Sequence, residues 1–176
     1  MSIENNIVEN MFNLGLIKHE NDNYHSEFVS SNNDIIIELD REKRLFSSSS
    51  EYSYLCKFTF KNNLGIILKQ FVLSPLNVSI MLDNIYNLLE FGIDEIYMQF
   101  ECSGLNYEDI AIKIELKCIN NKYYETFILY NYINEQLIPI LSFDIIDNIV
   151  DFCYLLYYTF LIDIGNFKLQ DPYDFI

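Results

Sequence analysis

The two histidines of this chain lie in one polar segment, where His19 and His25 flank a short stretch that also contains Glu20. Imidazole and carboxylate groups in this arrangement could hold a metal ion if the segment folded back on itself. No motif supplies a third ligand, and neither histidine stands near a serine or cysteine in a nucleophile motif. We therefore expect neither a metal site nor a catalytic residue in this segment.

A second pattern concerns Glu115-Leu116-Lys117, with Asp94 or Asp109 upstream. It has the form of the metal site of many metal-dependent nucleases, in which two carboxylates hold a divalent cation and the lysine steadies the attacked phosphate. Charged residues at every second position, here Lys113, Glu115 and Lys117, are also typical of the solvent face of a half-buried strand. A nuclease with a formal charge of -15 would repel its substrate. A nuclease-like enzyme is therefore only a second alternative to a protein without enzymatic activity.

The cysteines and glycines give no sign of cofactor chemistry. The four cysteines form no CxxC pair, which argues against a zinc ribbon or a redox motif. The five glycines are scattered singly, so the sequence contains no phosphate-binding loop. The N-terminal residues lack the basic flank and apolar core of a secretory signal. We expect reduced thiols, no cofactor and a cytoplasmic location.

Hydrophobic periodicity predicts the elements that carry the polar residues. The predicted strands and helices are a helix over residues 2–14, strands at Ile35–Leu39, Tyr54–Phe60, Ile66–Leu73, Glu95–Glu101, Ile110–Cys118 and Tyr123–Ile133, a helix from Pro75 to about Phe91, and a helix from about Phe143 to Ile162. Lys18–Ser26 reads as a loop or weak hairpin and Asp40–Arg44 as a charged turn. The expected fold is a single α+β domain over residues 1–176. It has a mostly antiparallel sheet of about five to seven strands, with N-terminal, middle and C-terminal helices packed against it.

The acid surplus is the strongest functional signal in the composition, which counts 26 acidic residues against 11 basic ones. A field of this sign repels nucleic acid and anionic membranes and attracts basic proteins. Asp144, Asp147 and Asp151 have a structural explanation, because acids at the start of the last helix complement its dipole. Another part of the surplus serves solubility. A further group of acids lies at Asp94–Glu101 and Glu108–Asp109, and tyrosine is well suited to interfaces. The predicted partner-binding residues are Asp94, Glu95, Tyr97, Glu101, Glu108 and Asp109.

A small acidic α+β chain without catalytic motifs resembles bacterial immunity proteins in general character. The resemblance implies an inhibitor that neutralises a basic toxin, such as a nuclease, by blocking its active site. The opening segment Ile7–Leu16 and the order of the predicted elements are also similar to class I type III secretion chaperones. That likeness implies a homodimer formed through Leu76–Phe91, which would hold an effector on exposed apolar strand faces. Both resemblances predict a basic protein partner, a toxin domain or a secreted effector, for a monomer or homodimer, and we favour the inhibitor.

Overall fold

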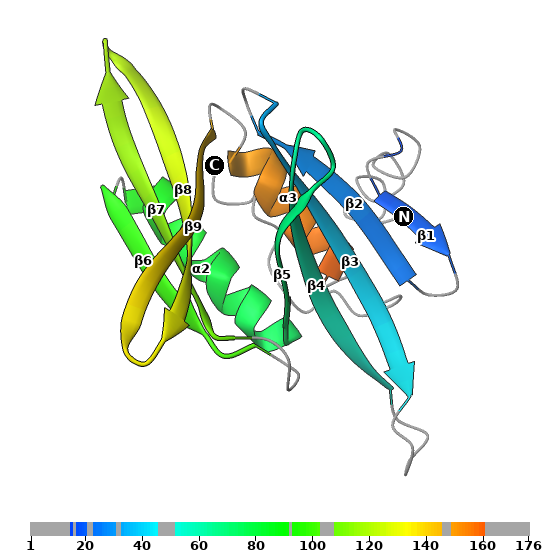
Figure 1. Ribbon diagram of the computed structural model, residues 1–176. Coiled ribbons are helices and arrows are strands. Elements are labelled where there is room, and N and C mark those ends of the chain that lie inside the picture. The colour runs from blue at the N-terminus through cyan, green and yellow to red at the C-terminus, as the bar shows by residue number, and fades with distance from the viewer. Residues whose placement is uncertain are drawn as a thin grey trace.

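The chain forms a five-stranded and a four-stranded antiparallel sheet, with helices packed against them (Figure 1). The computed structural model describes residues 15, 17–20, 23–30, 33–45, 52–91, 93–102, 108–145 and 149–160. Sheet A has the order β1-β2-β3-β4-β5 and sheet B the order β6-β7-β8-β9. The elements are β1 (Ile17–Glu20), β2 (Asn23–Val29), β3 (Ile35–Leu45), β4 (Tyr52–Asn62), β5 (Ile67–Leu73), α2 (Pro75–Phe91), β6 (Glu95–Phe100), β7 (Ile110–Ile119), β8 (Lys122–Ile133), β9 (Gln136–Ile145) and α3 (Ile149–Phe160).

The α+β class is confirmed, but the prediction of one sheet of five to seven strands with three helices is partly wrong. The strands divide into two sheets, and the described residues contain two helices. The predicted helix over residues 2–14 lies outside the described residues. The extra strands come from Lys18–Ser26, which forms most of the β1–β2 hairpin, and from the segment after β8. No helix in the described part of the chain is both long and apolar enough to cross a membrane.

The predicted start of the last helix at about Phe143 is wrong, because that residue lies on β9. Asn134 and Glu135 both have positive φ, 51° and 62°, and form a two-residue turn that returns the chain alongside β8. Pro139 is tolerated on β9 because an edge strand leaves one side of its backbone without ladder hydrogen bonds. Asp144 therefore does not lie at a helix start but on β9, where it accepts a hydrogen bond from Thr126 at 2.9 Å.

The charged turn predicted at Asp40–Arg44 is also wrong, since β3 continues through it to Leu45. The strand alternation places Asp40 on the solvent face of sheet A and Arg41 on the inner face, 2% exposed. The Arg41 guanidinium carbon lies 3.6 Å from the centre of the Tyr54 ring and 5.1 Å from that of Tyr24. An arginine is normally exposed because of its charge. Contact with the two tyrosine rings helps to stabilise Arg41 in its buried position.

The two sheets and the helices share one hydrophobic core. Helix α2 contacts β4 and β6, whereas α3 contacts β1, β2 and β3, and the two helices also touch each other (Figure 1). The Phe127 ring of β8 lies 6.0 Å from the Phe60 ring of β4, centre to centre, and so connects sheet B to sheet A. A buried hydrogen bond of 2.7 Å between Ser26 and Thr159 joins β2 to α3. This common core holds the strands of both sheets in place, including β6.

Candidate functional site

Strand β6 forms an edge of sheet B, and among the described residues β7 is its one strand neighbour (Figure 1). Its residues alternate between the core and solvent along the whole strand. Ile96, Met98 and Phe100 are buried, and Glu95, Tyr97 and Gln99 are exposed. Tyr97 is 43% exposed, and its hydroxyl accepts a hydrogen bond of 2.5 Å from the Gln99 side chain. The strand predicted at Glu95–Glu101 is confirmed, and it ends at Phe100.

The backbone hydrogen bonds of β6 can be assigned from its register with β7. The Leu116 N–H donates to the Asp94 carbonyl at 2.7 Å, so this antiparallel pair is a hydrogen-bonded one. The register runs without a shift from Glu95, opposite Glu115, to Phe100. Because hydrogen-bonded pairs recur at every second residue, the even-numbered residues of β6 bond to β7. The odd-numbered residues, Glu95, Tyr97 and Gln99, therefore direct their N–H and C=O groups towards the free edge.

The six predicted binding residues do not form one cluster, because the β6–β7 pairing separates them. Asp94 and Glu95 lie at one end of β6, which we call the Asp94 end. The register brings Glu101 opposite Asp109, with Glu108 beside it, at what we call the Glu101 end. The two ends are about 20 Å apart at the usual rise per strand residue. All five acids are exposed, and Tyr97 lies between the two ends on the same strand.

Lysines neutralise some of these acids but not all of them. Lys113 lies 2.7 Å from Glu115 and 3.4 Å from Glu95, and Lys117 lies 3.4 Å from Glu115. The hydrogen bond from Lys113 lowers the pKa of Glu115 and is also the main cause of the raised pKa of Lys113. Lys69 approaches Glu108 at 4.0 Å.

Three acids of the two ends, Asp94, Glu101 and Asp109, have no ion pair with any described residue. Burial raises the pKa of the neighbouring Cys102 thiol to about 11, and the negative charge of Asp109 adds to this effect. The carboxylate of Asp109 therefore adds negative potential at the Glu101 end, which the positive charge of Lys69 partly offsets.

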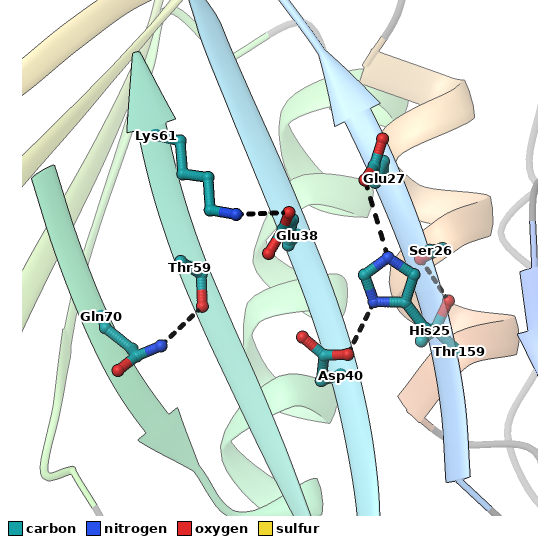
Figure 2. Close-up of polar contacts among 9 residues, drawn as sticks. All are labelled: His25, Ser26, Glu27, Glu38, Asp40, Thr59, Lys61, Gln70 and Thr159. Carbon is teal, nitrogen blue, oxygen red and sulfur yellow. Dashed lines mark hydrogen bonds and ion pairs between the residues drawn. The ribbon is translucent and has the colours of Figure 1, made fainter. Parts of the chain in front are cut away.

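The solvent face of sheet A differs, because several of its charges are paired within the sheet. Figure 2 shows Lys61 of β4 bonded to Glu38 of β3 at 2.7 Å. It also shows the His25 imidazole of β2 with Nδ1 2.6 Å from a carboxylate oxygen of Asp40. His25 Nε2 lies 3.7 Å from Glu27. The carboxylates of Glu27, Glu38 and Asp40 are therefore less available to a partner than those of the unpaired acids near β6.

The structure places some of the residues considered for metal binding. No group of three or more His, Cys, Asp or Glu side chains among the described residues is placed to hold a metal ion. Asp109 lies at the opposite end of the β6–β7 ladder from Glu115, whereas Asp94 lies at the same end, opposite Leu116. The Glu115 carboxylate is paired with Lys113 and Lys117. His25 lies on the outer face of sheet A, whereas the side chains of His19 and Glu20 lie outside the described residues.

Two features were missed in the sequence. The tip of the β4–β5 hairpin exposes aliphatic side chains, with Leu64 80% exposed and Ile66 and Ile67 more than half exposed. The Asn62 side chain fixes this tip by accepting hydrogen bonds from the backbone of Leu64 and Ile66 at 3.0 and 2.9 Å. The apolar run Leu64-Gly65-Ile66-Ile67 lies at the junction of two predicted strands, and it could have indicated this exposed tip. The second missed feature is the exposed backbone edge of β6, which depends on strand order.

Comparison with protein-family models, with curated proteins and with solved structures finds no match to this chain.

Proposed function

We propose that the chain is a non-enzymatic protein-binding module that uses the two ends of β6 to bind a basic protein. The form we favour is an immunity or inhibitor protein of the cytoplasm, which neutralises a basic toxin such as a nuclease by covering its active site. The observation that carries this proposal is a set of three exposed carboxylates around an exposed edge strand, Asp94, Glu101 and Asp109, which have no ion pair within the described part of the chain.

Unpaired carboxylates favour a basic partner for two physical reasons. A cationic side chain that reaches Asp94 or Glu101 adds a new attraction, whereas at Glu115 it would compete with lysines already in place. The overall charge of -15 also accelerates the encounter with a basic protein, and this acceleration declines as salt is added. Fast, salt-sensitive association is useful to an inhibitor that must intercept a toxin.

Removing two of the unpaired charges should weaken inhibition. We expect the double variant Asp94→Asn/Glu101→Gln to bind a basic nuclease toxin about tenfold more weakly at low salt, mainly through slower association. The measurement is inhibition of each member of a panel of purified basic nuclease toxins, combined with association rates at low and high salt.

The matched control for this experiment is Glu27→Gln/Asp34→Asn. It removes the same charge from exposed positions on and beside sheet A, and we expect it to preserve most of the affinity. Equal losses for the two double variants, or no inhibition of any toxin by the parent protein, would count against the proposal.

A secretion chaperone is the second candidate, and it is favoured by exposed apolar side chains. Leu76 and Phe91 of α2 are 69% and 68% exposed, on the helix that the chaperone likeness assigns to dimerisation. The aliphatic tip around Leu64 could hold an apolar stretch of an effector. Light scattering separates the candidates, since a stable dimer that Leu76→Glu dissociates would favour the chaperone, and a monomer would favour the inhibitor.

A further inference from the structure

Strand β6 has the features of a site at which another strand can be added. Glu95, Tyr97 and Gln99 each direct one N–H donor and one C=O acceptor away from β7. These residues recur at the two-residue spacing at which a neighbouring strand presents its own donors and acceptors. The same residues expose their side chains, so that a strand added here would meet both the backbone and the side chains of β6.

The edge of β6 also lacks most of the devices by which proteins discourage strand addition, and its one charged residue is Glu95. It contains no lysine or proline, and its register with β7 is free of bulges. The other edges differ. The β4–β5 ladder has a register shift at Phe60/Lys61, the β8–β9 ladder has one at Leu129/Tyr130, and β9 contains Pro139. The remaining edge strand, β1, is only four residues long.

The charges around β6 decide which kind of strand fits. Acids stand at both of its ends, Asp94 and Glu95 at one and Glu101 and Asp109 at the other. A second copy of the chain that paired β6 with β6 would bring acids against acids in either orientation, which disfavours self-association. An extended segment with basic residues near both ends would find opposite charges, and an apolar side chain between them could pack against Tyr97.

We propose that β6 binds its partner by strand addition, taking up an extended basic segment of that protein as a further strand of sheet B. This inference rests on the proposed function for the basic nature of the partner, but it makes a separate claim about the mode of binding. Main-chain hydrogen bonds to Glu95, Tyr97 and Gln99 supply much of the affinity, and the acids at the two ends select basic sequences.

The backbone claim can be tested with the variant Tyr97→Pro. Proline removes the outward N–H of Tyr97 but leaves the ladder with β7 intact, because that N–H does not point towards β7. Tyr97→Ala is the matched control, since it removes the ring and keeps the N–H. The probe is a labelled peptide of alternating lysine and valine long enough to span β6, with a glutamate–valine peptide as the negative control.

We expect the lysine–valine peptide to bind the parent protein and Tyr97→Ala, and to bind Tyr97→Pro about tenfold more weakly or worse. Equal binding to Tyr97→Pro and Tyr97→Ala, or no binding to the parent protein, overturns strand addition. Those results leave the charge experiment with Asp94→Asn/Glu101→Gln as an independent test of the proposed function.

A second probe keeps the test decisive if Tyr97→Pro does not fold. An added strand directs only every second N–H towards its neighbour. We therefore compare two peptides, one N-methylated at the odd-numbered residues and the other at the even-numbered residues. Methylation should abolish binding in the peptide whose methylated N–H groups face β6, and should preserve binding in the other. Equal effects of the two methylation phases contradict strand addition.

Discussion

Replacing Phe127 by alanine should lower the free energy of unfolding by about 3–5 kcal/mol, a large part of the roughly 5–15 kcal/mol that stabilises a typical domain. The Phe127 ring is 1% exposed and lies 5.0 Å from Phe143 and 6.2 Å from Phe152, in addition to its contact with Phe60 of sheet A. The substitution would leave a cavity where both sheets and α3 meet. Urea denaturation followed by circular dichroism and tyrosine fluorescence measures the loss.

The neighbouring Ile128 provides the control for this experiment. Its side chain is on the opposite face of β8 and only partly buried, so Ile128→Ala should cost clearly less than Phe127→Ala. Because the two sheets share one core, we expect a single transition with both probes. Two separate transitions, or equal losses for Phe127→Ala and Ile128→Ala, would contradict the common core.

Replacing Arg41 by methionine should raise the free energy of unfolding, by about 1–3 kcal/mol. The Arg41 side chain is almost fully buried, and its Nε and Nη1 atoms have no hydrogen-bond partner among the residues that the structure describes. Contact with the Tyr24 and Tyr54 rings offsets only part of the desolvation of a guanidinium. Methionine fills a similar volume without a charge and retains contact with the rings.

Arg41→Lys is the informative companion to Arg41→Met. Lysine keeps the charge but loses the planar group that lies over the Tyr54 ring, so Arg41→Lys should be less stable than the parent protein. Thermal and urea unfolding of the three proteins decide the order. If Arg41→Met were the least stable of the three, the buried guanidinium would contribute more than the described contacts account for.

Much of the fold could be predicted from the sequence, where pattern and turn chemistry agreed. The alternation in Ile110–Cys118 predicted a strand, which the structure extends by one residue as β7. Asn120 and Asn121, which follow it, both adopt positive φ in the turn of the β7–β8 hairpin. Ser74 followed by Pro75 predicted the start of α2, and the Ser74 hydroxyl does accept a hydrogen bond from the backbone of Asn77 at 3.2 Å. These signals are local, so a single sequence contains them.

The errors arose where tertiary contacts override local signals. Asp40–Arg44 reads as a turn because its residues are charged, yet tyrosine rings of neighbouring strands receive Arg41 and the strand continues. Strand β9 was missed because Asn134-Glu135 is a weaker turn signal than Asn-Gly and because Pro139 argues against a strand unless the strand is an edge. Whether β9 is an edge strand depends on the order of the strands in the sheet, and that order is not a local property of the sequence.

The candidate site shows the same division between local and tertiary information. The exposure of the predicted acids and of Tyr97 follows from alternation and polarity, and the structure places all of them at the surface. Their separation into the Asp94 end and the Glu101 end depends on the β6–β7 register, which the sequence does not reveal. The free backbone edge between the two ends likewise depends on strand order, and it changes the predicted surface from an acidic patch to an acidic strand edge.

Amide hydrogen exchange, measured by NMR with and without the lysine–valine peptide, tests the central claim most directly. In the free protein, the amides of Ile96, Met98 and Phe100 should be protected by their bonds to β7, whereas those of Glu95, Tyr97 and Gln99 should exchange rapidly. Strand addition predicts that the peptide slows exchange at Glu95, Tyr97 and Gln99 and leaves the even-numbered amides as they were. Binding of the peptide with no new protection at these three amides would contradict the account.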